Sequence, residues 1–144
     1  LVNFMDPPSV FNTKYVKKLL SMSDKSTRFV GSVYEKESLK ALRYYSLAYF
    51  HGHSVGGTNP SLLEALGCGN VIIAHNNPFN REVADDTAVY FSSPNEIAEI
   101  ISSLESGKIR LNPEKAKGRI SSIYNWDSIA DKYYNLIGCE IKSQ

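Results

Sequence analysis

The segment that decides the fold is YFHGHSVGGTNPSLLEALGCGN, residues 49–70. An apolar run is followed by three glycines, a serine, a threonine and an Asn-Pro pair. Asn59 is a good N-cap, and Pro60 suits the first helical position because proline has no amide hydrogen to leave unpaired. The segment therefore predicts a buried strand, a loop over residues 52–59, and a helix that begins at Pro60 and ends just before Gly67.

The same alternation of apolar strands and capped helices extends over the whole chain. No Asn-Gly or Asp-Gly pair joins adjacent strands, so hairpins are not expected. This pattern predicts an α/β fold with a Rossmann-like, doubly wound parallel sheet and extra helices at the C-terminal end that pack back over the sheet. Strands are predicted at 1–5, 28–30, 47–51, 71–74 and 88–91, and helices at 12–22, 36–45, 94–106, 113 onward and 128–137, the last ended by Gly138.

Composition indicates one domain, spanning residues 1–144. The chain is 42% hydrophobic and 22% charged, and its formal net charge of +1 gives no global field for nucleic acid or an anionic membrane. Cys68 and Cys139 lie far apart without a CxxC pair, so we expect free thiols in a reducing compartment. No apolar run approaches the roughly 20 residues that span a bilayer. These features predict a cytoplasmic protein.

The glycine-rich loop is the candidate binding site. In an open parallel sheet, ligands bind beyond the carboxyl ends of the strands. Gly56 and Gly57 permit positive φ or close approach by a ligand, and Thr58 adds a hydroxyl. The first turn of the helix is expected to offer unpaired amides, which together form an anion site. These amides belong to Ser61, which also has a hydroxyl, Leu62 and Leu63.

Glu64 lies one turn into this helix, away from its apolar side. A carboxylate there repels a phosphate but can accept hydrogen bonds from the ribose hydroxyls of a nucleotide. The alternative is a plain turn, with Glu64 placed to complement the helix dipole. His51 and His53 lack a third ligand at suitable spacing, so no metal site is expected.

The segment GHSVGGTNPSLLEALGCGNVIIAHNNPFNREV resembles the C-terminal, donor-binding half of GT-B glycosyltransferases of retaining family 4. It is most similar to the branch with bacterial rhamnosyltransferases of capsule and O-antigen synthesis. The likeness extends upstream to RFVGSVYEKESLKALRYYSLAYFHGHS and downstream to YNWDSIADKYYNLI. It implies transfer of a hexosyl or deoxyhexosyl unit, such as rhamnosyl, from a UDP-, dTDP- or GDP-linked donor to a polysaccharide or lipid-linked glycan, with no metal cofactor.

The resemblance also implies roles for individual residues. The family carries two glutamates eight positions apart; Glu64 matches the second, which holds the ribose. The first falls on Gly56, so the catalytic group is left unassigned. Gly57, Thr58 and Asn59 fall where relatives bring backbone amides to the diphosphate and sugar. A His near this loop can contact the donor in relatives, which makes His53 a further candidate. Glu82, beside Arg81, matches an acid that recurs in the family after the next strand. For Arg81 and Glu82, a plain salt-bridge role is the alternative.

The family's diphosphate-neutralising Arg and Lys, and its acceptor-binding domain, would lie before Leu1. We therefore expect an N-terminally truncated fragment that binds nucleotide weakly and transfers no sugar alone. Helix 126–138 would pack toward the missing domain, and any contact with the inner face of a membrane would come through that half. The alternatives are a non-catalytic α/β interaction module and a sugar-nucleotide epimerase of the same fold.

Overall fold

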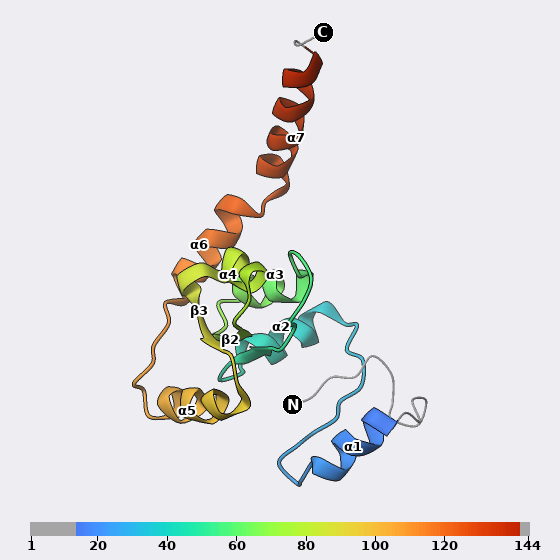
Figure 1. Cartoon of the computed structure of the whole chain (residues 1–144), viewed down its shortest axis with the longest axis vertical. Helices are drawn as coiled ribbons and strands as arrows, with labels where there is room; N and C mark the ends of the chain where they lie inside the picture. Colours follow the sequence, from blue (N-terminus) through green and yellow to red (C-terminus); the bar gives the residue numbers. More distant parts are fainter. Residues whose placement is uncertain (1–13, 142–144) are drawn as a thin grey trace. The chain divides into compact units, whose positions relative to one another are not determined.

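The structure is a computed structural model that describes residues 14–141 (Figure 1). The strand predicted at 1–5 and the first residues of the helix predicted at 12–22 lie outside this range. The chain divides into two compact units, Leu1–Leu42 and Arg43–Gln144, and each is described by itself. The prediction of a single domain over residues 1–144 stays a prediction.

The first unit contains α1 (Lys14–Met22) and most of α2 (Lys36–Tyr44), as the helical spacing of its apolar residues predicts. Val16 is the buried residue of α1. The strand predicted at 28–30 is wrong, because within the described chain this range holds only an isolated β-bridge at Phe29. Gly31 follows with a φ of 68°, which turns the chain before a ladder can extend.

The second unit is built on a three-stranded parallel sheet. Its strands are β1 (Tyr49–His51), β2 (Ile72–His75) and β3 (Ala88–Phe91), in the order β1-β2-β3. Tyr49 pairs with Ile72, which in turn pairs with Ala88, so the three carboxyl ends meet at one edge. The parallel α/β class is therefore confirmed.

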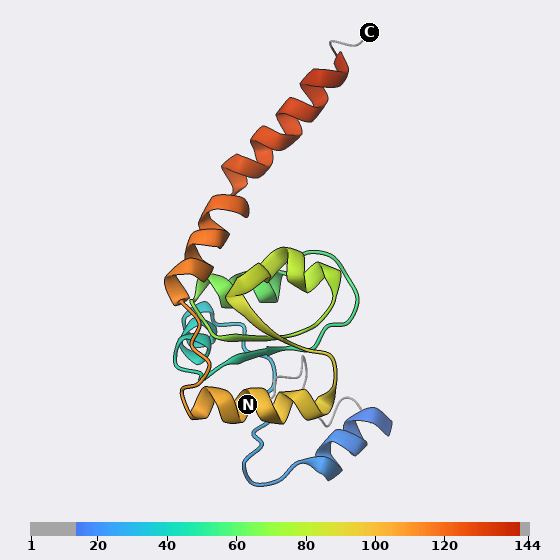
Figure 2. The same cartoon turned by 60° about the vertical axis from the view of Figure 1, so that its left-hand side comes forward.

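Helices pack on both faces of this sheet, as Figure 2 shows. On one face, buried side chains of α3 (Pro60–Gly67) and α4 (Pro78–Ala84) meet the sheet around Ile72. On the other, Ile100 of α5 (Pro94–Glu105) packs against Ile73 and Phe91. The middle strand β2 is thus covered on both sides, which is why its sequence is a continuous apolar run.

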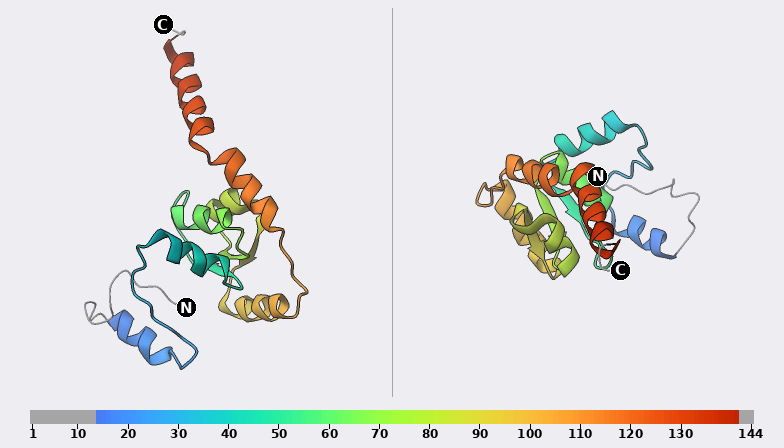
Figure 3. Two further views of the ribbon diagram at one scale, coloured as in Figure 1. Left: turned by 180° about the vertical axis from the view of Figure 1, so that it is seen from behind. Right: turned by 90° about the horizontal axis from the view of Figure 1, so that it is seen from above.

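The C-terminal helices are α6 (Pro113–Ile123) and α7 (Trp126–Ile141). Ala116 of α6 joins the core cluster that contains Leu62 and Leu66 of α3, and the views in Figure 3 show α6 beside α3. The prediction that the C-terminal helices pack back over the sheet holds only for α5. Helix α6 lies on α3, and no described residue of α7 belongs to either buried cluster.

Two predicted helix ends are wrong. Gly67 is the last residue of α3 rather than the first beyond it, and the left-handed residue that ends the helix is Gly69, with a φ of 75°. The Asn70 amide donates to the Ala65 carbonyl, which closes the turn. Gly138 does not end α7, which begins at Trp126 and continues to Ile141; one interior glycine costs a helix only about 1 kcal/mol.

Helix α4 and the following 3₁₀ turn (Asp85–Thr87) were not predicted. The available signal was Asn77-Pro78, which repeats the Asn59-Pro60 start of α3. The Asn77 side chain accepts from the Asn80 amide at 2.8 Å. Seven residues with a polar centre are too few to show helical periodicity, so the cap was the only local signal.

Candidate functional site

The glycine-rich loop follows β1 and lies beyond the carboxyl end of the sheet, where the sequence places it. Residues 52–58 are all exposed. Gly56 has a φ of 120°, a conformation that side-chain-bearing residues rarely adopt, so the backbone itself requires glycine there. The φ of Gly57 lies outside the range that side-chain-bearing residues rarely adopt, and a Cβ added to Gly57 would meet nothing within 4 Å. The protein's own packing therefore does not require glycine at position 57.

The prediction of unpaired amides at the start of α3 is wrong. The Ser61 amide donates to the Asn59 side chain at 3.0 Å. The amides of Leu62 and Leu63 donate to the Asn59 backbone carbonyl at 3.0 and 3.2 Å. Asn59 thus occupies all three donors, because a capping side chain and a tight first turn act together.

Free amide donors lie instead within the loop. No hydrogen bond ties the amides of residues 54–58 to any other residue between 14 and 141. The residues that carry these amides are exposed and follow one another along an irregular backbone. Consecutive free amides of this kind form concave sites for anions. The candidate anion site is therefore the loop around Gly57 and Thr58 rather than the start of α3.

Glu64 is exposed on α3, as predicted, but it already has a partner. Its Oε2 lies 2.7 Å from an Arg43 guanidinium nitrogen at the end of α2. The Arg43 side chain is only 12% exposed, whereas the Glu64 side chain is 55% exposed. Arg43 thus contacts one carboxylate oxygen of a side chain that is still half exposed. Sequence reasoning missed Arg43 because its only signal was membership of a basic helical stripe.

Tyr49 links this ion pair to the loop. Its hydroxyl lies near the Ser61 side chain at the start of α3, and burial raises the pKa of the phenol. The nearby Arg43 charge acts in the opposite direction. The hydroxyl of Ser61, predicted as a ligand contact, therefore lies beside the Tyr49 phenol.

His51 is the last residue of β1 and is 1% exposed. Neither ring nitrogen has a hydrogen-bond partner in the described part of the chain. The His53 ring stacks on it with centroids 4.6 Å apart. Burial, and secondarily the charge of His53, lowers the pKa of His51 from 6.5 to about 4. At neutral pH this imidazole is uncharged.

Helix α4 fixes the start of the loop. The side-chain amides of Asn77 and Asn80 donate to the His53 carbonyl at 2.9 and 3.0 Å. Asn80 also donates to the His75 carbonyl at the end of β2. The loop is thus held at His53 by α4 and at Asn59 by α3, with the segment 54–58 unsupported between them.

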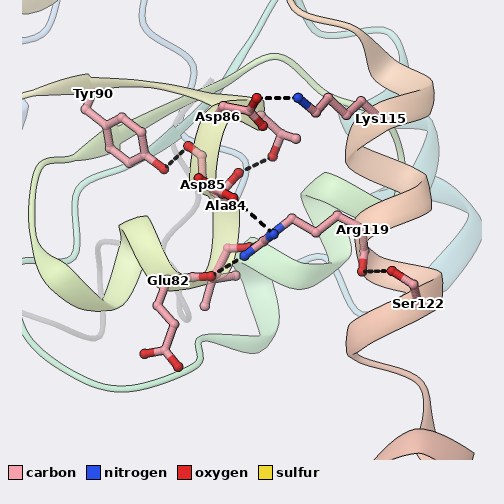
Figure 4. A network of polar contacts seen from close by, with 10 residues as sticks. Glu82, Ala84, Asp85, Asp86, Tyr90, Lys115, Arg119 and Ser122 are labelled. Atoms are coloured by element: carbon pink, nitrogen blue, oxygen red, sulfur yellow. Dashed lines mark hydrogen bonds and ion pairs between the residues drawn. The ribbon is translucent and has the colours of Figure 1, made fainter.

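Arg81 and Glu82 have their contacts elsewhere. The Arg81 Nε donates to the Asn76 side chain at 2.6 Å, and its guanidinium lies 4.3 Å from the Tyr90 ring centroid. Glu82 offers its backbone carbonyl to Arg119, while its carboxylate is turned away (Figure 4). Arg81 is therefore engaged with Asn76 and Tyr90 and Glu82 with Arg119 through its backbone, and neither makes, within residues 14–141, the salt bridge that was the alternative role weighed for them.

Comparison with known proteins gives no identification: no protein-family model matches the chain, and no curated protein or solved structure is significantly similar to it. Among the described side chains, no group of three His, Cys, Asp or Glu is arranged as a metal site. No helix within residues 14–141 is long and apolar enough to cross a bilayer.

Proposed function

We propose that this chain is the nucleotide-sugar-binding domain of a GT-B glycosyltransferase of retaining family 4. The parent enzyme would transfer a hexosyl or deoxyhexosyl unit, such as rhamnosyl, to a polysaccharide or lipid-linked glycan. One observation carries the proposal: the unpaired amides of the exposed residues 54–58 lie beyond the carboxyl end of β1, and Glu64 follows one turn into the next helix. The sheet would be the core of a Rossmann-like, doubly wound fold.

In this proposal the diphosphate of a UDP-, dTDP- or GDP-linked sugar binds the loop amides. Amide donors stabilise the negative charge that develops on the leaving diphosphate as the glycosidic bond breaks. Gly57, which the fold itself does not require, lets the diphosphate approach the backbone closely. The scheme uses no metal ion.

The Arg43–Glu64 pair serves the ribose. Arg43 is held in place, since its carbonyl accepts from the Asn70 side chain and its guanidinium contacts Glu64. The ion pair fixes the orientation of Glu64, so the carboxylate oxygen that Arg43 does not contact can accept from a ribose hydroxyl. Gly56 replaces the family's other glutamate, and its φ of 120° makes the loop conformation unsuited to a glutamate there.

Glu64→Gln is expected to weaken nucleotide binding about tenfold, because a charged acceptor becomes a neutral one. Glutamine retains an oxygen that can accept from Arg43, so the fold should be kept. Glu64→Ala should weaken binding similarly and also cost about 1 kcal/mol of stability, since Arg43 loses its partner at a half-exposed site. The measurement is saturation-transfer NMR with UDP, dTDP, GDP and their sugars. Equal signals from the variants and the wild type would refute the ribose role of Glu64.

Gly57→Ala is expected to leave the melting temperature unchanged and to weaken binding of the same ligands. The added methyl group meets no protein atom within 4 Å, but it would occupy space needed by the diphosphate. Gly56→Ala is the matched contrast, since strain at a φ of 120° should cost about 1–3 kcal/mol. Thermal melts and NMR titrations of both variants test this. Unchanged affinity in Gly57→Ala would show that no ligand approaches there.

A non-catalytic interaction module is the second candidate. The observation that favours it is an exposed apolar set on α7, comprising Trp126, Tyr133, Tyr134, Leu136 and Ile137. Such exposed patches often mark a protein–protein interface. In that case the glycine loop is only a turn, and Glu64→Gln and Gly57→Ala would alter no binding property. Nucleotide titration of the wild-type chain separates the two candidates.

A further inference from the structure

His51 is a buried polar side chain that nothing in the described protein satisfies. A neutral imidazole carries one donor and one acceptor, and both of its ring nitrogens lie within the protein without a partner. Burying such a group unpaired is unfavourable, and an apolar residue of similar size would avoid the penalty. The position therefore calls for an explanation other than stability.

The neighbouring polar groups are engaged with other partners. The Tyr49 hydroxyl on the same strand lies near Ser61. The side-chain amides of Asn77 and Asn80 donate to the His53 carbonyl. His53 offers its ring face by stacking and makes no hydrogen bond to the His51 ring. A partner for His51 therefore has to come from outside these side chains.

His51 faces the same side of the sheet as α3. Side chains alternate along β1: Phe50 stacks on Phe91 toward the α5 face, whereas Tyr49 packs against the α3 core cluster. His51 shares the Tyr49 side and lies at the strand end from which the loop departs. The His53 ring, at the start of the loop, stacks on the His51 ring at this end of the strand.

We propose that His51 hydrogen-bonds a hydroxyl group of the bound sugar nucleotide, and that movement of the loop 52–58 admits it. A hydroxyl can donate to the unprotonated ring nitrogen of a neutral imidazole or accept from the protonated one, whereas an ionised phosphate can only accept. The inference rests on the proposed donor site and supplies a polar contact where Gly56 replaces the family's glutamate. The hydroxyl belongs either to the ribose or to the transferred sugar.

The test measures both stability and ligand binding, because replacing His51 should raise the first and weaken the second. His51→Leu and His51→Phe remove the unpaired nitrogens, so both variants should melt several degrees higher than the wild type. Both should bind the best wild-type ligand at least tenfold more weakly. The ligand is chosen by titrating the wild type with UDP, dTDP and GDP and with UDP-glucose, dTDP-rhamnose and GDP-mannose. Tyr90→Phe is the control, since that hydroxyl is bonded to the Asp85 carbonyl beside β3 and should leave affinity unchanged.

A variant-free measurement accompanies the titrations. Long-range ¹H–¹⁵N spectra of the wild type should show the His51 ring nitrogens shifting as the ligand is added. A loss of affinity for both the nucleoside diphosphate and its sugar assigns the hydroxyl to the ribose. A loss confined to the nucleotide sugar assigns it to the transferred unit.

Two outcomes overturn the inference and are distinguishable. If the wild type binds and the His51 variants bind within twofold of it, His51 serves only a buried water, and the donor site itself stands. If the wild type binds none of the six compounds at millimolar concentration, both the donor site and the role of His51 fail.

Discussion

Acidification from pH 7 to pH 5 is expected to lower the free energy of unfolding by about 2 kcal/mol through His51 alone. Burial, then the charge of His53, lowers the pKa of His51 from 6.5 to about 4 in the folded protein. Between these values the unfolded chain binds the proton and the folded chain does not. Stability therefore falls as the pH falls from 6.5, and this loss levels off below pH 4.

The measurement is urea unfolding at pH 7, 6 and 5 for the wild type and His51→Leu, and the difference between the two isolates the His51 contribution. The pH range from 5 to 7 lies above the range in which the Asp86 and Glu96 carboxylates titrate, because hydrogen bonds lower their pKa values below the ordinary range. If the free energy of unfolding changes equally with pH in the wild type and in His51→Leu, burial does not shield the His51 imidazole from protonation.

The succession of helices and strands in the second unit could be predicted from sequence because each is signalled by residues that are adjacent in the chain. Asn59-Pro60 and Asn112-Pro113 start helices through side chains that accept from amides two or three residues onward. The continuous apolar run of β2 requires cover on both faces, and α3, α4 and α5 provide it. Each signal depends on neighbours in the chain, so no knowledge of tertiary contacts was needed.

The site could be predicted only in part, because its contacts are long-range. Position and exposure of the loop and of Glu64 follow from the strand–loop–helix pattern. The Arg43–Glu64 ion pair joins residues 21 positions apart, and Asn80 reaches back 27 positions to His53. The saturated amides of α3 were missed for a different reason: the sequence shows that Asn59 can cap, but not how many donors it satisfies.

Arg119→Met is expected to destabilise the second unit by about 2–3 kcal/mol. The Arg119 Nε donates to the Val83 carbonyl at 2.8 Å, and its Nη2 donates to the Glu82 carbonyl at 2.6 Å (Figure 4). Its Nη1 lies 3.3 Å from the Asp85 carboxylate. A cation on the last carbonyls of α4 also complements the helix dipole. Methionine keeps much of the apolar stem but leaves these carbonyls without their charged donor.

Lys115→Met is the matched control, because Lys115 lies on the same helix and pairs with the neighbouring Asp86. Both side chains of that pair are more than half exposed, so the control should cost no more than about 0.5 kcal/mol. Urea unfolding measures both variants. Equal losses would mean that general charge balance, rather than capping of α4, gives Arg119 its effect.

The consequence of losing Arg119 should reach the glycine loop. Helix α4 is capped by Arg119 at its carboxyl end, and at its amino end Asn77 and Asn80 hold the His53 carbonyl. Loosening a seven-residue helix at one end weakens its other end, because so short a helix depends on its tertiary contacts. Hydrogen exchange in Arg119→Met should therefore accelerate in residues 78–84 and at the His53 end of the loop, with β2 and α5 less affected. Acceleration confined to α6 would instead show that the loop is held independently of Arg119.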